Sequence, residues 1–346
     1  MRYTSVVFWI GCLAVLLSTT SCSKSRDERL WGEYAESSLV FQPLPITPLL
    51  GSPYSIDVID SVLVIADKVE DRTLLLYNMK DSTYVRTLSI GNGPGEVVFP
   101  IDVSVSSQER AVNVFLRQTG EFRTYPFDNL LKDRLSEYRS VDLGMADRGI
   151  QTSEGYVALG IYEDGLLRAY DPKGALRQKE DLYAEYGIDD ANERYLLFQG
   201  MLSFNRQGNC FAIAPSWASD VLFYRYADGR WREYHRFQIG DGSLEKQVSG
   251  RADLRIHRIN QCESICSSQN YFYVLHDGNR MDSVQRKDYR SILCFDAFTG
   301  ELEHVYRVDP TVCGICVSNQ KMYALLIGED GEYTVGVTAL DDLSLN

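Results

Sequence analysis

Side chains that bind polar ligands recur in the longer polar segments of the chain. Aromatic rings such as those of Trp217 and Tyr162 can stack on a sugar or another apolar ring face, while carboxylates and arginines hydrogen-bond to its rim. The same segments carry eight further candidates for ligand binding: Asp67, Arg72, Arg117, Asp164, Asp220, His276, Arg280 and Glu329. These residue types predict a binding surface of mixed charged and aromatic character.

Catalysis would require such groups to converge. Two carboxylates that act on a glycosidic bond must lie roughly 5–10 Å apart, and a sequence does not define that separation. The chain has four histidines, of which His276 alone falls in one of these polar segments. It contains no Gly-x-Ser-x-Gly, His-Glu-x-x-His or phosphate-loop motif. We therefore predict no catalytic residue and no cofactor, and keep a carbohydrate-active enzyme as the alternative.

Two cysteine pairs have spacings that invite a zinc interpretation. Three residues separate Cys262 from Cys266, and two separate Cys313 from Cys316. Both pairs lie in strand-like segments, where residues three apart point to opposite faces, and the first pair lacks the glycine-bearing turn of a zinc ribbon. We predict no metal site. Disulfides and buried free thiols both remain open for the six cysteines after residue 22.

The N-terminus has the features of an export signal. Arg2 precedes an apolar run over residues 6–17, and small residues at 18–21 precede Cys22. This order predicts a lipoprotein signal peptide over residues 1–21, lipidation of Cys22, and an anchor and linker over residues 22–37. Thr19 stands where a lipobox usually has an aliphatic residue, so an ordinary signal peptide or an uncleaved anchor is the alternative.

Composition limits the partners. Cleavage after residue 21 leaves 325 residues, without a second apolar stretch of membrane-spanning length. The net charge of the whole chain is −13, and this excess repels nucleic acid and anionic lipid headgroups. We therefore expect no nucleic-acid partner, and membrane contact through the N-terminal lipid. Acidic residues 27–28 resemble the tags of surface lipoproteins, so we predict an outer-membrane lipoprotein that is either surface-exposed or periplasm-facing.

The rest of the chain repeats a unit of four short strands joined by turns. The first unit has alternating or apolar strands at residues 55–58, 61–66, 74–77 and 85–90. Its third strand recurs, with an aromatic end in most copies, at residues 122–125, 167–170, 221–224, 292–295 and 333–337. Units of roughly 40–50 residues with four strands are typical of propeller blades. We predict an all-β, six-bladed β-propeller over residues 38–346, with a pair of β-sandwiches as the alternative.

The sixth unit lacks a fourth strand. Residues 38–44 are strand-like and belong to no unit of their own. We predict that they supply the outer strand of the blade that begins at Val312, because natural sheets avoid unpaired edges. The ring of four-stranded antiparallel blades would then be closed by an N-terminal strand.

One passage of the first unit carries a family resemblance. Residues 53–96 end in the turn Gly-Asn-Gly-Pro-Gly-Glu at 91–96, whose glycines and proline suit a tight connection between blades. This passage, together with the lipobox, resembles the TolB-like six-bladed propeller lipoproteins of Bacteroidetes bacteria. The resemblance implies a propeller exported to the cell envelope, and it brings no established activity and no catalytic residues.

Propeller topology places the candidate residues on one face. Loops between second and third strands, and connections between blades, surround one mouth of the channel, and tight turns occupy the other face. The ten candidates all fall in loops of the first kind, so we predict the site there. Packing between blades is the alternative for the aromatics, and solvation for the acids. The longer connections at 181–199 and 241–260 could hold short helices, at 182–186 and 252–256, which cap the channel or meet a partner.

These features predict a lipid-anchored binding or interaction module whose ligand is a glycan, a peptide or a partner envelope protein. The alternative function is a propeller-fold polysaccharide lyase or glycoside hydrolase, because a fold does not determine a function. A scaffolding lipoprotein without a ligand is the third possibility.

Overall fold

The computed structural model describes residues 34–93, 95–239, 261–279 and 290–340. The chain divides into two compact units, Met1–Tyr34 and Ala35–Asn346. Almost all of the first unit, including Cys22, lies outside the described residues. The described part of the second unit is built of strands with three short helical segments, which confirms the all-β fold class.

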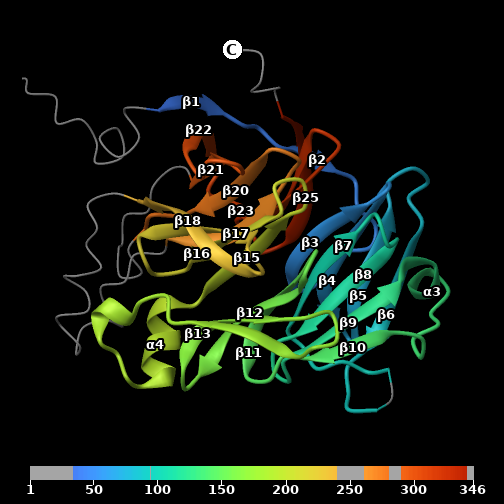
Figure 1. The fold of residues 1–346 in the computed structure, drawn as a ribbon. Coiled ribbons are helices and arrows are strands. Elements are labelled where there is room, and N and C mark those ends of the chain that lie inside the picture. Colours follow the sequence, from blue (N-terminus) through green and yellow to red (C-terminus); the bar gives the residue numbers. More distant parts are fainter. Residues whose placement is uncertain (1–33, 94, 240–260, 280–289, 341–346) are drawn as a thin grey trace, which may run out of the picture. The chain divides into compact units, whose positions relative to one another are not determined.

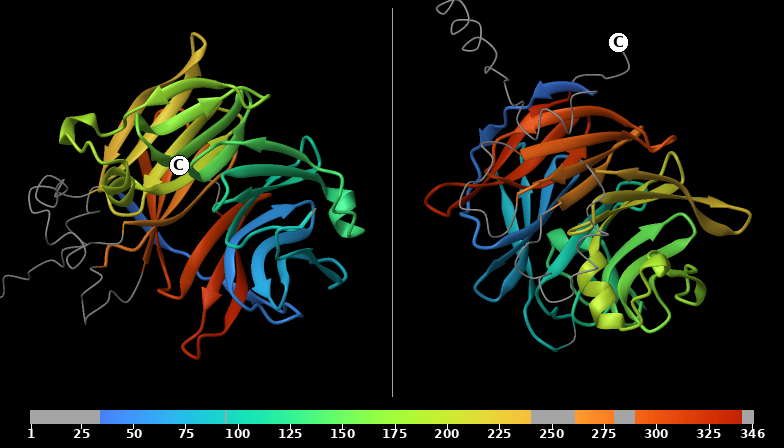
Figure 2. Two further views of the ribbon diagram at one scale, coloured as in Figure 1. Left: turned by 90° about the horizontal axis from the view of Figure 1, so that it is seen from below. Right: turned by 90° about the vertical axis from the view of Figure 1, so that its left-hand side faces the viewer.

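The strands form six sheets arranged as the blades of a propeller, as predicted (Figures 1 and 2). Each blade begins with its inner strand and continues outward by antiparallel pairing. Blade 1 contains β3 (Pro53–Ile59), β4 (Val62–Val69), β5 (Arg72–Asn78) and β6 (Tyr84–Ser89). Blade 2 contains β7 (Ile101–Ser106), β8 (Ala111–Leu116), β9 (Glu121–Pro126) and β10 (Arg139–Asp142). Blade 3 contains β11 (Ala146–Thr152), β12 (Gly155–Tyr162), β13 (Gly165–Tyr170) and β14 (Leu176–Glu180).

The second half of the ring continues this order. Blade 4 contains β15 (Gly200–Asn205), β16 (Cys210–Pro215), β17 (Asp220–Ala227) and β18 (Arg230–Gln238). Blade 5 contains β19 (Cys262–Ser267), β20 (Tyr271–His276), β21 (Arg290–Asp296) and β22 (Leu302–Val308). Blade 6 contains β23 (Val312–Ser318), β24 (Lys321–Ile327) and β25 (Tyr333–Ala339). The inner strand β23 of this last blade lies beside β3 of the first, so the ring is complete.

The second strand of each blade explains how the blades cohere. All six residues of β8 are buried, and so are all six residues of β16. When both faces of a sheet are covered, the sequence of a strand is a continuous apolar run and does not alternate between apolar and polar residues. Neighbouring blades provide that cover, and the apolar clusters of the core accordingly join residues from adjacent blades.

Two N-terminal strands close the ring. Strand β2 (Gln42–Leu44) pairs antiparallel with β25 and gives blade 6 its fourth strand, as predicted. Residues 38–44 do not form one strand, however. The chain first runs as β1 (Ala35–Ser38) parallel to β22, which makes blade 5 five-stranded, and only then crosses to blade 6 (Figure 1). The side chains of Ser37 and Glu36 hold β1 through His304 at 2.8 Å and Arg307 at 2.7 Å.

Helical segments occupy the connections. α3 (Phe127–Leu131) joins β9 to β10 in blade 2. The connection from blade 3 to blade 4 holds the 3-10 helix η1 (Ala184–Tyr186), which overlaps the predicted 182–186 helix. The same connection also holds an unpredicted helix, α4 (Ala191–Phe198), whose N-cap Asp190 accepts a 2.7 Å hydrogen bond from the Glu193 amide. The connection predicted at 241–260, with its helix at 252–256, falls outside the described residues.

The glycine-rich segment at 91–96 is a tight connection between blades 1 and 2. The Glu96 carboxylate accepts a 2.7 Å hydrogen bond from the Gly93 amide. A Cβ at Gly91 would lie 2.0 Å from Oε2 of Glu96, so a larger residue there would displace the glutamate carboxylate. Gly95 adopts a φ of 80°, in the left-handed region that glycine tolerates best. The segment therefore shapes a turn around its own glutamate.

No helix among the described residues combines the length and the apolar character that crossing a membrane requires.

Candidate functional site

A cavity of about 500 Å³ occupies the end of the channel where the inner strands begin. This end carries the blade-to-blade connections and the loops between second and third strands, so it is the face on which the site was predicted. All six blades contribute to its wall. Near the start of each inner strand, one side chain lines the cavity: Tyr54, Asp102, Arg148, Met201, Glu263 and Cys313.

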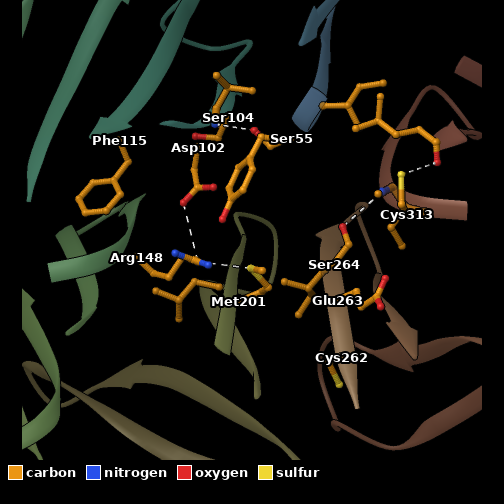
Figure 3. Close-up of a pocket in the computed structure, with 18 of the residues that line it drawn as sticks. Ser55, Asp102, Ser104, Phe115, Arg148, Met201, Cys262, Glu263, Ser264 and Cys313 are labelled. Carbon is orange, nitrogen blue, oxygen red and sulfur yellow. Dashed lines mark hydrogen bonds and ion pairs between the residues drawn. The ribbon is translucent and has the colours of Figure 1, made fainter. Parts of the chain in front are cut away.

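Asp102 and Arg148 lie together on one side of this cavity (Figure 3). The Nε of Arg148 is 3.8 Å from Oδ2 of Asp102 and donates a 3.4 Å hydrogen bond to the Met201 sulfur. The same guanidinium pairs with the carboxylate of the preceding residue, Asp147. Among the described residues, no group donates a hydrogen bond to the Asp102 carboxylate, whose Oδ2 is closed off from solvent. Burial raises the pKa of Asp102 to about 6, against the opposing effect of Arg148.

Behind this pair, a second arginine fixes Asp147. Arg117 Nη2 lies 2.8 Å from Oδ2 of Asp147, and its Nε donates to Oδ1 at 3.2 Å. The hydroxyl of Tyr195, from α4, also donates to Asp147. The Arg117 guanidinium lies 5.2 Å from the centre of the Tyr54 ring. Asp147 is thus held by two arginines and a tyrosine, and it fixes Arg148 at the cavity wall.

Glu263 lies on the opposite side of the cavity and has a cationic partner (Figure 3). Arg290 forms an ion pair with its carboxylate and donates a 2.7 Å hydrogen bond to the Val312 carbonyl. The two carboxylates that line the cavity therefore differ in environment. Glu263 faces a cation at hydrogen-bonding distance, whereas Asp102 has only the longer contact with Arg148.

Serine side chains of the cavity wall join the inner strands of neighbouring blades. Ser55 Oγ accepts a 2.9 Å hydrogen bond from the Val103 amide, which links blades 1 and 2. Ser264 Oγ accepts one of 3.2 Å from the Ile315 amide, which links blades 5 and 6. An inner strand has one edge without a strand partner, and these bonds satisfy amides on that edge. The cavity floor is consequently cross-linked between blades.

Cysteines at the cavity are unsuited to nucleophilic chemistry. The six described cysteines are free thiols. Burial raises the pKa of Cys313 to about 11 and raises that of Cys262 further. A thiol is reactive as its thiolate, so neither group is activated at neutral pH. Nor do the described residues contain any cluster of three histidine, cysteine or acidic side chains that could hold a metal ion.

The cavity includes few of the residues predicted from the sequence. Trp217 lines it, and Arg117 stands directly behind its wall through Asp147. Asp67 is fully buried and accepts hydrogen bonds from the amides of Gly51 and Ser52. Asp67 therefore belongs to the frame of blade 1, and it is not among the residues that line the cavity.

The other predicted residues are distributed around the same face. Tyr162 is buried beneath Arg168, whose guanidinium is 4.0 Å from the ring centre. Asp164 is held by Arg168 and Lys179, and hydrogen bonds from these two cations lower its pKa to about 2.

Two more of the predicted residues, Asp220 and His276, are buried. Asp220 accepts a 2.9 Å hydrogen bond from the Tyr183 hydroxyl, and burial raises its pKa to about 6. His276 is buried, with Nε2 3.0 Å from Oε1 of Gln261. Arg72 lies 3.8 Å from Asp133, Glu329 is exposed in the β24–β25 loop, and Arg280 lies outside the described residues.

The residues that the sequence analysis missed share a register position. Tyr54, Asp102, Met201 and Glu263 are each the second residue of an inner strand, and Arg148 is the third residue of β11. Aligning the six units on their first strands would have brought these positions together. These positions lie in strands, whereas functional residues are more frequent in loops, so loop composition gives no sign of them.

Comparisons with known proteins show the fold. No protein-family model matches the chain, and no curated protein matches it. A member of the DUF4221 family from Bacteroides vulgatus has a similar structure, with a TM-score of 0.54 and 10% identity over 87% of this chain and 98% of that one. A Bacteroides fragilis protein described as exported gives a TM-score of 0.56 and 11% identity, over 89% and 99% of the two chains. A luciferin-regenerating enzyme gives 0.50 and 12% identity, over 88% and 96%. At these identities the similarity extends to the fold alone.

Proposed function

We propose that this protein is a lipid-anchored propeller of the bacterial cell envelope that binds a ligand, without chemical conversion, at the loop-face mouth of its channel. The lipobox-like segment ending at Cys22 supports the anchor. The similar fold of Bacteroides proteins, one described as exported, supports the location and the relation to TolB-like lipoproteins of Bacteroidetes. The ligand is a glycan, a peptide or a partner envelope protein.

The observation that carries this proposal is the environment of Asp102. Its carboxylate faces a cavity of about 500 Å³ and accepts no hydrogen bond from the described residues. Buried polar groups almost always have partners, because a missing hydrogen bond to a charged group is costly. Because Oδ2 is closed off from solvent, an N–H or O–H group of a bound ligand would donate to the other oxygen of this carboxylate, Oδ1.

The surrounding wall suits such a ligand. Tyr54 and Trp217 offer ring surface, Met201 offers a polarisable apolar contact, and Arg148 offers a cation beside the open carboxylate. Arg117 and Asp147 hold Arg148 in place before any ligand arrives. A preorganised site loses less entropy on binding. A few fixed polar groups among apolar ones are also the usual composition of a binding pocket.

Glycan and peptide arrays probed with the mature protein test the proposal. For any ligand found, titration calorimetry should show an affinity at least tenfold lower for Asp102→Asn, because a hydrogen bond to a charged group is lost. Asp228→Asn is the matched control, since Asp228 lies in the exposed β17–β18 turn and has a positive φ that asparagine tolerates. An absence of ligands on both arrays, or equal affinity of wild type and Asp102→Asn, would contradict the proposal.

A glycoside hydrolase is the second candidate, because the cavity contains two carboxylates in different environments. Burial raises the pKa of Asp102 to about 6, which suits a general acid, while Glu263 forms an ion pair with Arg290. Sugar release from neutral oligosaccharides that is abolished by both Asp102→Asn and Glu263→Gln would favour this function. The lyase alternative has less support, since no histidine is among the described residues that line the cavity.

A further inference from the structure

The opposite mouth of the channel has a different chemical character. A cavity of about 740 Å³ opens there, among the turns that join first strands to second strands. About half of its lining residues carry hydroxyl or amide side chains, including Ser104, Asn113, Gln151, Ser203 and Gln269, and nearly all of the others are apolar. Asp57 and Arg206 are the only charged residues among the described ones that line it. Charged residues make up 24% of the whole chain, so this mouth is unusually neutral.

A second cavity, of about 560 Å³, adjoins the first between blades 5 and 6. Ser268, Gln269, Val317 and Ser318 line both cavities, which places the two side by side. The remaining described residues around the second cavity are Asn270, Tyr271, Tyr273, Asn319, Gln320 and Leu340. None of the residues that line this second cavity is charged. We call the two adjoining cavities, with these lining residues, the neutral groove.

The backbone of the neutral groove is fixed by contacts between blades. The side-chain Nδ2 of Asn205 donates hydrogen bonds to the backbone carbonyls of Ser268 at 2.6 Å and Gln269 at 3.2 Å. Ser267 Oγ donates to the Phe204 carbonyl at 2.9 Å. These bonds tie the β19–β20 turn of blade 5 to blade 4, so that the groove wall is set before a ligand binds.

Several side chains of the neutral groove keep their hydrogen-bonding capacity. Within the described part of the chain, no hydrogen bond involves the side chains of Gln269, Ser318, Asn319 or Gln320. Asn319 and Gln320 have φ values of 51° and 58° and together form the β23–β24 turn. That turn projects two amide side chains next to each other at the groove.

Amide and hydroxyl groups both donate and accept hydrogen bonds, as the hydroxyl groups of a sugar do. A charged ligand would leave water for a wall that offers it almost no counter-charge, at a cost in solvation energy. The partly exposed ring of Tyr271, whose centre is 6.2 Å from that of Tyr273, adds an aromatic surface of the kind that packs against a sugar ring. Both cavities fall within the usual range of about 300–1,000 Å³ for ligand pockets.

From this composition we infer that the neutral groove is a binding site for an uncharged oligosaccharide. The site lies on the tight-turn face, at the opposite end of the channel from the Asp102 cavity. The neutral groove and the Asp102 cavity share seven aliphatic or hydroxyl lining residues along the channel, but Asp102, Arg148, Met201, Tyr54 and Trp217, which carry the function proposed above, line only the Asp102 cavity.

Titration calorimetry with defined hexasaccharides tests the inference. The probes are maltohexaose, cellohexaose, mannohexaose and xylohexaose, with a galacturonate hexamer as the charged comparison, each against the mature protein. We expect at least one neutral hexasaccharide to bind, and the galacturonate hexamer to bind at least tenfold more weakly. The double variant Gln269→Ala, Ser318→Ala removes two open hydrogen-bonding groups and should weaken binding about tenfold or more.

Three further variants locate the site. Ser61→Ala, in the corresponding β3–β4 turn of blade 1, should bind as the wild type does, and so should Asp102→Asn. Gln269→Glu keeps the size of the side chain but adds a charge, and it should also weaken binding. This variant tests the site even if the double alanine variant does not fold.

The inference is overturned if no neutral hexasaccharide binds, if the groove variants bind as tightly as wild type, or if the charged hexamer binds equally well. Loss of binding in Asp102→Asn alone would place the sugar at the other mouth. That result would support the proposed function and overturn this inference.

Discussion

Replacing Asp67 with alanine should destabilise the protein strongly. The carboxylate is fully buried and accepts hydrogen bonds from the amides of Gly51 at 2.9 Å and Ser52 at 2.8 Å. Its second oxygen accepts a 2.8 Å bond from Arg86, whose side chain is 14% exposed. Alanine would leave two amides without an acceptor and would deprive the Arg86 guanidinium of its carboxylate partner, although Nη2 of Arg86 still donates a 2.9 Å hydrogen bond to the Leu49 carbonyl.

The size of the effect follows from these contacts. Breaking a buried ion pair by removing one partner costs about 3–5 kcal/mol, because the remaining charge is uncompensated. In a protein of this length, 1 kcal/mol corresponds to a shift in melting temperature of roughly 2 °C. Scanning calorimetry should therefore show a melting temperature about 6–10 °C lower for Asp67→Ala. Asp67→Asn should be intermediate, since its oxygen still accepts from the two amides.

Asp71→Ala is the matched control. Asp71 is 72% exposed and lies 3.9 Å from Arg72, a surface pair that contributes less than about 1 kcal/mol. The double variant Asp67→Ala, Arg86→Met should recover part of the lost stability, because it removes the stranded charge. Equal melting temperatures for Asp67→Ala and Asp71→Ala would refute the structural role of Asp67. So would a loss of ligand binding at unchanged stability.

Three other changes probe separate features of the molecule. A Cβ at Gly336 would lie 2.7 Å from Cβ of Phe41, so Gly336→Val should displace β2. Amide hydrogen exchange should then become faster in blade 6 and stay unchanged in blade 3. An equal change of the exchange rates in both blades would contradict ring closure by β2. Burial raises the pKa of both Asp57 and Asp102 from 3.8 to about 6, so the folded state takes up protons that the unfolded state does not between about pH 6 and pH 4. The free energy of unfolding should therefore rise as pH falls through this window, and urea titrations of a variant with asparagine at both positions should show a flatter profile. Cys22→Ala should abolish lipid labelling and release the protein from membrane fractions, whereas unchanged labelling would exclude Cys22 as the lipidated residue.

The fold was largely predictable because blade strands and turns leave a repeated pattern. Third strands ending in an aromatic residue, and turn residues at fixed places, identified all six blades, and the missing outer strand of blade 6 identified β2. Strand β1 left no comparable pattern. Its four residues are polar or small and all exposed, and it pairs through the backbone and two side-chain contacts. Helix α4 does have a signal in the sequence, because Asp190 and Glu193 have the spacing of a capping box.

The candidate site was predictable only in part. Loop composition identified Trp217 at the cavity and Arg117 behind it. The pairing of Asp102 with Arg148 was out of reach, because it joins inner strands of neighbouring blades whose relative register appears only in the closed ring. Asp67 shows the converse error, since a carboxylate in a polar segment proved to be an internal acceptor for backbone amides.

The two N-terminal strands also set the order of events in biogenesis. Ser37 and His304, which join β1 to β22, are 267 positions apart, and β2 must find a partner that lies still later in the chain. At synthesis rates of about 5–20 residues per second, the earliest strands wait for their partners for roughly tens of seconds. Until then blades 5 and 6 do not exist, and blade 1 has no neighbour on one side. The nascent chain therefore reaches its folded state only when its final blade emerges. Premature termination before β25 leaves β2 without its partner, and termination before β22 leaves β1 without its partner as well, so that these strands are exposed to pairing with other chains.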